Sequence, residues 1–167
     1  MSEPSKTWGV AEASANWRLA PGDLPDVNVW VGLCCAAHPS HASAMRYWQS
    51  ACDAGTPLWF CRTTMLGLVR LLSQPRVMGP NVLSLTQAMA MYRQWLSTPA
   101  VGLLMDPPGL DDAIEAILGR RLEPQPVRLW TDMALAATAQ SSGLRMVTFD
   151  HDFERFGLER CLVLQGD

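Results

Sequence analysis

The sequence predicts an α/β fold with a mostly parallel central sheet and helices on both of its faces. Short apolar segments typical of buried strands alternate along the chain with longer segments of helical periodicity, which is the order found in parallel sheets. The length of 167 residues suits one such domain. Apolar residues make up 49% of the chain and charged residues 17%, which indicates a folded globular protein and not a disordered one.

The chain divides into two regions at about residue 23. Residues 1–23 are rich in Ser, Ala, Pro and Gly, and we interpret them as a flexible or loosely docked N-terminal extension. Residues 24–167 form the predicted domain. Its first strand is expected at residues 24–31, where Val and Trp alternate with polar residues.

The remaining elements follow in alternation. Further strands are expected at residues 57–61, 101–105, 145–149 and 161–164. Helices are expected at residues 40–54, 63–73, 84–95, 110–121 and 131–142. Their ends are marked by the N-cap candidates Ser40, Ser84 and Thr131 and by Gly55 and Gly143 after the last turn.

Composition limits the classes of partner and compartment. The net charge of −3 gives no global attraction to nucleic acid, so any RNA binding must be local and must use arginine, because Lys6 is the only lysine. None of the five cysteines lies in a C-x-x-C pair, which favours reduced thiols in a cytosolic protein. No apolar run is long enough to span a membrane.

Acidic residues stand where the expected strands end. Asp26 and Asn28 lie two apart in the first strand, so their side chains would share a face. Asp132 lies in the first turn of a helix, and Asp150 directly follows a strand. Each residue alone has a structural explanation, as a buried hydrogen-bonded pair, a helix-dipole partner or a turn residue. Together, the three aspartates belong to elements that this topology can bring to one edge of the sheet.

Three clustered carboxylates repel one another, and a divalent cation removes that conflict. Oxygen-only ligands suit Mg²⁺ or Mn²⁺, which can polarise a phosphodiester and activate a bound water. The acids therefore predict hydrolysis of a phosphodiester by metal-activated water.

Several motifs, in this order along the chain, resemble PIN-domain ribonucleases of the VapC type. The resemblance covers residues 24 to about 165, and the ordered set is more specific than any single motif. The motifs are Leu-Pro-Asp26-Val-Asn28-Val-Trp, His38-Pro-Ser-His41 followed by Trp48, the segment at residues 60–79, Trp130-Thr131-Asp132 and Val147-Thr-Phe-Asp150-His-Asp152-Phe153.

The resemblance implies a PIN-like three-layer fold and an endoribonuclease that depends on Mg²⁺ or Mn²⁺. It also implies the toxin of a type II toxin–antitoxin system, with RNA as substrate, a cognate antitoxin as partner, a homodimer and a cytoplasmic location. By motif, Asp26, Asp132 and Asp150 take the metal-binding and catalytic roles, and Asp152 is a candidate further ligand.

Four other residues are expected to orient the acids or to contact the substrate. The resemblance implies that Asn28 and Thr131 orient the acids, and Arg62 and Thr64 are candidate substrate contacts. Trp130 stands beside a candidate acid, where packing is the expected role and base stacking the alternative.

One departure from the family pattern leaves two hypotheses open. Many PIN nucleases carry a glutamate on the helix expected here at residues 63–73, and Met65 and Gly67 occupy the candidate positions. Either another acid such as Asp152 completes the site, or the site is weakened. In the second case the chain would be a degenerate PIN domain that binds a protein partner or RNA without cutting.

Overall fold

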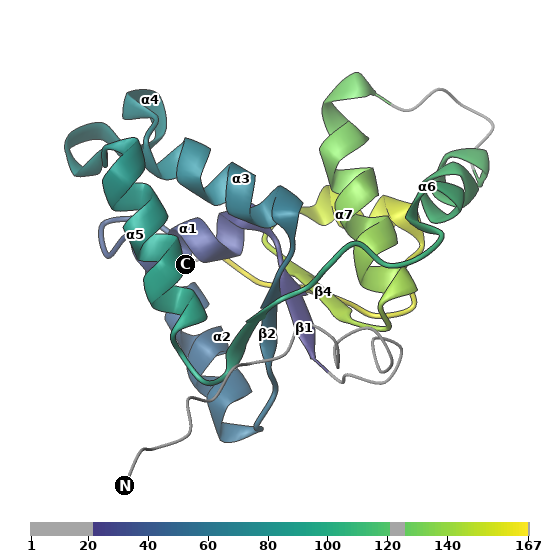
Figure 1. Ribbon diagram of the computed structural model, residues 1–167, viewed down its shortest axis with the longest axis horizontal. Coiled ribbons are helices and arrows are strands. Elements are labelled where there is room, and N and C mark those ends of the chain that lie inside the picture. Colours follow the sequence, from purple (N-terminus) through teal and green to yellow (C-terminus); the bar gives the residue numbers. More distant parts are fainter. Residues whose placement is uncertain (1–21, 121–125, 167) are drawn as a thin grey trace, which may run out of the picture.

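A computed structural model describes residues 22–120 and 126–166 (Figure 1). Its centre is a five-stranded sheet with the order β3-β2-β1-β4-β5, and all four pairings are parallel. The strands are β1 (Asp23–Pro25), β2 (Leu58–Phe60), β3 (Val101–Leu103), β4 (Arg145–Thr148) and β5 (Cys161–Val163). The predicted parallel sheet is therefore confirmed.

Helices cover both faces of the sheet, as predicted. The α-helices are α1 (Val27–Cys34), α2 (His41–Asp53), α3 (Arg62–Leu72), α4 (Pro75–Met78), α5 (Leu85–Leu96), α6 (Leu110–Gly119) and α7 (Trp130–Ser141). Three short 3₁₀ helices are η1 (Gly79–Asn81), η2 (Val127–Leu129) and η3 (His151–Phe156). In Figure 1, α1, α2, α3 and α5 lie on one side of the sheet, and α6 and α7 lie on the other.

Each face of the sheet has its own hydrophobic core. On the α1 side, the fully buried Trp30 stacks on Phe60 with ring centroids 3.8 Å apart. On the α7 side, Leu135, Met146 and Phe153 are buried together. Because neighbouring residues of a strand point to opposite faces, Met146 enters one core and Val147 the other. The molecule thus has the three layers that the sequence predicts.

Most predicted helix ends are confirmed. The Ser84 hydroxyl accepts a hydrogen bond from the Gln87 N–H at 3.2 Å, and Gly55 and Gly143 have φ values of 64° and 66° after their helices. The predicted N-cap at Thr131 is wrong, because α7 begins at Trp130 with Leu129 as its N-cap. Residues 127–129 form a 3₁₀ turn that leads directly into α7.

The predicted first strand is wrong beyond Pro25. The strand β1 ends there, and residues 27–34 form α1. Asp26 and Asn28 therefore do not share the face of a strand: Asp26 is the N-cap of α1, and Asn28 lies in its first turn. The cause is a buried helix whose residues 29–33 all face the core, so it lacks the amphipathic period that distinguishes helix from strand.

A buried ion pair joins the first residues of β1 and β4. Asp23 is 1% exposed and accepts two hydrogen bonds from the Arg145 guanidinium, at 2.9 and 2.7 Å. The Tyr47 hydroxyl donates to the same carboxylate at 2.8 Å. These two strands also pair Asp23 with Arg145 in the sheet register, so the ion pair lies at the N-terminal edge, opposite the strand ends that carry the predicted site.

The predicted extension falls largely outside the described residues. Of residues 1–23, the structure describes Gly22 and Asp23, and Asp23 already belongs to β1. In the described part of the chain, no helix has the length and apolar character needed to cross a membrane. All five cysteines are free thiols, with Cys61 buried and Cys52 exposed.

Gly67 lets α3 approach α1 closely. A Cβ atom placed on Gly67 would lie 2.6 Å from a methyl carbon of Val27, the first residue of α1. The methyl groups of valine have little rotational freedom, so α1 or α3 would have to shift. This contact sets the position of the helix start that carries Asp26 and Asn28.

We expect Gly67→Ala to lower the free energy of unfolding by about 1–2 kcal/mol, because overpacking outweighs the helix propensity gained from alanine. Gly119→Ala is the matched control: Gly119 is also helical, but nothing lies within 4 Å of its added Cβ. The control should be neutral or slightly stabilising. Urea unfolding of both variants measures the difference, and equal stability of the two would show that the helices relax without cost.

Candidate functional site

Asp26 is held at the point where β1 ends and α1 begins. Its N–H donates to the carbonyl of Val147 at 2.8 Å, which ties this residue to β4. One carboxylate oxygen accepts from the Val27 N–H at 2.6 Å, as an N-cap does. The other oxygen accepts from the Thr148 hydroxyl at 2.9 Å. Both oxygens are therefore oriented by neighbours before any ligand binds.

Thr148 connects three residues of the site and is the functional residue that the sequence analysis missed. Its fully buried hydroxyl donates to Asp26 and accepts from the Asn28 side-chain amide at 3.1 Å and from the Asp150 N–H at 3.0 Å. Asn28 also accepts from the Phe149 N–H at 3.3 Å. The sequence signal that could have identified Thr148 is its place in an apolar strand, two residues before a candidate acid.

Asp132 and Asp150 complete a cluster with Asp26. The pKa of Asp26 is raised to about 6, chiefly by burial and also by the charges of Asp132 and Asp150, while the bonds from Thr148 and Val27 oppose the rise. The pKa of the half-buried Asp132 is also raised, first by burial and then by Asp150 and Asp152, against the opposing charge of Arg128. The fold thus brings the three predicted acids together.

This cluster has the chemistry of a site for a hard divalent cation. Its donors are carboxylate oxygens, and their mutual repulsion is relieved by a bound cation. Within residues 22–120 and 126–166, however, no group of three or more His, Cys, Asp or Glu side chains is already arranged as a metal site. The residue types and the charge fit Mg²⁺ or Mn²⁺, and the side chains would have to converge further on binding.

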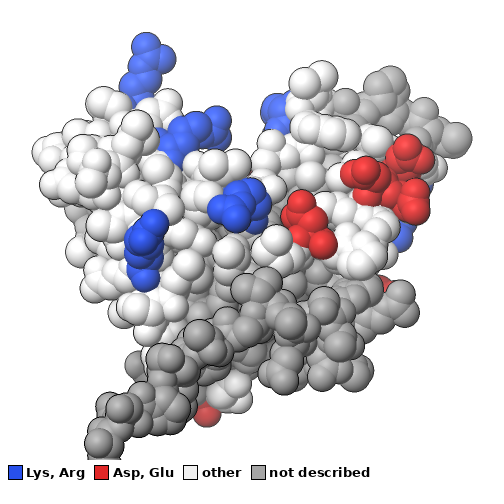
Figure 2. All heavy atoms as spheres, in the orientation of Figure 1, with Lys and Arg blue, Asp and Glu red and all other residues white. Residues whose placement is uncertain are grey.

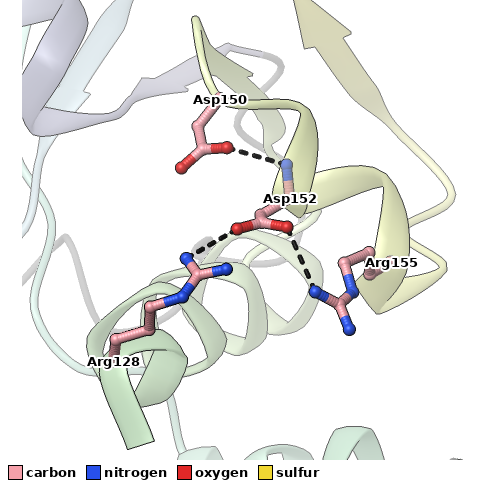
Figure 3. A network of polar contacts seen from close by, with 4 residues as sticks. All are labelled: Arg128, Asp150, Asp152 and Arg155. Atoms are coloured by element: carbon pink, nitrogen blue, oxygen red, sulfur yellow. Dashed lines mark hydrogen bonds and ion pairs between the residues drawn. The ribbon is translucent and has the colours of Figure 1, made fainter. Parts of the chain in front are cut away.

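Asp152, the candidate further ligand, has different partners from the three clustered acids. One of its carboxylate oxygens accepts from Arg128 at 2.7 Å and the other from Arg155 at 3.2 Å (Figure 3). These two arginines lower the pKa of Asp152. Its backbone N–H donates to Asp150 at 2.8 Å, so Asp152 is adjacent to the cluster while its carboxylate is occupied by cations.

The candidate substrate contacts differ in accessibility. Arg62 is exposed at the start of α3 and is free to reach a ligand. Thr64 is fully buried, and its hydroxyl bonds to the backbone N–H and carbonyl of Cys61 at 2.9 and 3.0 Å. Thr64 therefore caps α3, and the prediction that it contacts substrate is wrong because it has no exposed surface. Thr131 is exposed in the first turn of α7.

The positions considered for the absent glutamate both face the protein interior. Met65 is 8% exposed and belongs to the core on the α1 side, and Gly67 packs against Val27. A carboxylate at either position would be buried among apolar groups. The helix α3 contains no acid, so it supplies no carboxylate to the cluster.

Figure 2 shows a notch between the part of the molecule built from α3–α5 and the part built from α6 and α7, with basic side chains on both sides. Trp130, the first residue of α7, is 53% exposed, and Val127 in the preceding turn is 91% exposed. The expected packing role of Trp130 is therefore wrong, and its indole is available to a ligand.

Comparisons with known proteins agree with this architecture. The family model of the PIN domain matches residues 24–158. Ribonuclease VapC41 of Mycobacterium tuberculosis is 33% identical over 138 residues, which cover 80% of this chain and 92% of that protein. Ribonuclease VapC33 of the same organism is 29% identical over 133 residues, covering 80% and 91%.

Solved structures show the same fold. The crystal structure of Mycobacterium tuberculosis VapC20, a Sarcin-Ricin loop cleaving toxin, superposes with a TM-score of 0.60 at 21% identity and covers 86% of this chain and all (100%) of that one. The DNA-bound VapBC of Salmonella typhimurium superposes with a TM-score of 0.60 at 16% identity, covering 84% and 96%. With its matched family model and its parallel three-layer architecture, this chain belongs to the PIN domain family.

Proposed function

We propose that this protein is an endoribonuclease and the toxic component of a type II toxin–antitoxin system, and that it hydrolyses RNA phosphodiester bonds with Mg²⁺ or Mn²⁺. The observation that carries the proposal is the meeting of Asp26, Asp132 and Asp150 at one sheet edge, where the charges of Asp132 and Asp150 raise the pKa of Asp26 and the charge of Asp150 raises that of Asp132. Relatives that match 80% of this chain bear the name ribonuclease, which supports the reaction class.

The three aspartates would hold the cation, which when bound polarises the phosphodiester and lowers the pKa of the attacking water. Thr148 keeps the Asp26 carboxylate oriented, and Asn28 keeps the Thr148 hydroxyl oriented. Arg62, at the exposed start of α3, is placed to contact RNA phosphate. Asp132 lies in the first turn of α7, and the notch separates the part built from α3–α5 from the part built from α6 and α7, so substrate would bind between these two parts (Figure 2).

The proposed partners follow from the relatives. Several similar structures are of VapBC or FitAB bound to DNA, and we propose that a cognate antitoxin covers the notch of this chain and that two copies form a homodimer. Free thiols at all five cysteines support a cytoplasmic location. The alternative function is a degenerate PIN domain that binds RNA or a protein without cutting, and the absence of an acid in α3 favours it.

RNA cleavage by the purified protein separates these functions. We expect cutting with Mg²⁺ or Mn²⁺, none with EDTA, and a loss of at least about 100-fold in Asp26→Ala because a metal ligand is removed. Asp53→Ala is the matched control, since Asp53 is an exposed aspartate at the end of α2, and it should cut like the wild type. A folded wild-type protein that cuts none of a range of RNAs with either metal would establish the non-catalytic alternative.

The raised pKa of Asp26 predicts a pH-dependent effect on stability. In the metal-free protein, protonation of Asp26 favours the folded state; this contribution is complete below the ordinary aspartate pKa of 3.8 and is lost as the pH rises through about 6. Asparagine mimics the protonated form, so Asp26→Asn should raise the free energy of unfolding at pH 7.5 by about 1–3 kcal/mol. The gain should shrink toward pH 4.

Urea unfolding in EDTA at pH 4.5, 6 and 7.5 measures this difference between the variant and the wild type. Since all other groups titrate in both proteins, the difference isolates Asp26. A variant that is less stable than the wild type by the same amount at every pH would show that burial does not penalise the Asp26 charge. In that case the carboxylate would be an ordinary N-cap.

The exposed indole of Trp130 predicts a contact with RNA. A stacked base contributes about 1–3 kcal/mol to binding, so Trp130→Ala should weaken RNA affinity about 5- to 100-fold. Trp130→Phe keeps an aromatic face and should retain most of the affinity. Fluorescence anisotropy with single-stranded RNA in EDTA measures binding without cleavage. Equal affinity of the alanine variant and the wild type would assign the exposed indole to another partner.

A further inference from the structure

A single carboxylate is held between two arginines at the edge of the acid cluster. Asp152 accepts from Arg128 with one oxygen and from Arg155 with the other, and its N–H donates to Asp150 (Figure 3). Arg128 comes from the 3₁₀ turn before α7, whereas Asp152 and Arg155 belong to η3. The contact therefore connects the segment that leads to Asp132 with the segment that follows Asp150.

Arg128 is accessible and lies within the field of the clustered acids. Its side chain is 64% exposed, and besides Asp152 the charges of Asp150 and Asp132 act on it. One guanidinium nitrogen, Nη1, donates to Asp152. Its other N–H groups donate to no residue within 22–120 or 126–166. A guanidinium has five donors in a planar fork that matches the oxygens of a phosphate, so this one retains donors for a ligand.

We propose that Arg128 binds a backbone phosphate of the RNA substrate beside the three aspartates, and that Asp152 is a positioning residue for Arg128 and not a metal ligand. This proposal rests on the ribonuclease function proposed above. It answers the question left by the missing α3 glutamate in a specific way: Asp152 does not replace that acid.

Local charge supports a phosphate contact at this point. Asp26, Asp132 and Asp150 are three negative groups that would repel an RNA strand, and the whole chain carries a net charge of −3. The 64% exposed guanidinium of Arg128 presents a positive group next to the acids. An exposed ion pair adds little to stability, so folding alone gives small reason for the arrangement.

The geometry also explains why a positioning residue is useful. A free arginine side chain loses much rotamer freedom when it binds a phosphate. Because Asp152 already holds one nitrogen of Arg128 at 2.7 Å, part of that entropy is lost before RNA arrives. Asp152 in turn is fixed by Arg155 and by its own N–H bond to Asp150, which places the guanidinium relative to a catalytic acid.

The test uses the full chain with Arg128→Gln, Arg128→Lys, Asp152→Asn and the double variant Arg128→Gln/Asp152→Asn. Arg93→Gln is the matched control, because Arg93 is an exposed arginine of α5, on the other side of the notch. Anisotropy with single-stranded RNA in EDTA, over a series of NaCl concentrations, gives affinity and salt dependence without cleavage. Cleavage kinetics over a Mn²⁺ series give KM, kcat and the Mn²⁺ concentration for half-maximal activity.

We expect Arg128→Gln to weaken RNA binding about 10-fold and to lower the slope of log affinity against log salt by about one, whereas Arg93→Gln changes the slope much less. Arg128→Lys should recover the salt slope but only part of the affinity. Lysine keeps the positive charge but lacks the planar guanidinium, which can donate two parallel hydrogen bonds to a phosphate. Asp152→Asn should weaken binding less than Arg128→Gln, and the double variant should match Arg128→Gln alone. The Mn²⁺ requirement of Asp152→Asn should equal that of the wild type.

Two results would overturn the proposal. If Arg128→Gln has the affinity and salt slope of Arg93→Gln, Arg128 does not contact phosphate. If Asp152→Asn needs at least about 10-fold more Mn²⁺ while Arg128→Gln does not, Asp152 is a metal ligand. A wild-type protein that neither binds nor cuts RNA rejects the ribonuclease function together with this proposal, and both other results leave that function intact.

Discussion

The hydroxyl of Thr148 is the interaction on which the arrangement of the site depends. It is buried at the last residue of β4 and bonds to Asp26 and Asn28 at the start of α1 and to the backbone of Asp150 before η3. A hydroxyl can donate one bond and accept two, and Thr148 uses all three. Replacing it with valine would preserve the shape of the strand but leave buried polar groups without partners.

Asp26 is a carboxylate that the fold holds in place at some cost in stability. Its backbone is fixed by β4, its side chain caps α1, and its burial beside two other acids disfavours the charged form. Such a residue is destabilising in the free protein and becomes favourable when a positive ligand binds. Asp152 is in the opposite situation, because two arginines already neutralise it.

The sequence predicted the order of strands and helices, the parallel sheet and the three acids, because these depend on apolar pattern and on turn residues such as Gly55 and Gly143. It did not predict α1, since Val27, Val29 and Val31 favour a strand locally, whereas the helix is stabilised by the Asp26 N-cap and by burial of its residues 29–33. Nor did it predict the Thr148 or Arg128 contacts. Both join residues far apart in the chain, which no local pattern records.

Side chains at both ends of the four-residue strand β4 hold it in register with β1. At the first residue, Arg145 forms the buried pair with Asp23; at the last, Thr148 bonds to Asp26. Sliding the two strands by one position would break both contacts at once and would also exchange the faces of Met146 and Val147. The register of β1 and β4 is thus specified by two contacts, and the register that forms the ion pair at one edge also aligns Asp26 with Thr148 at the other.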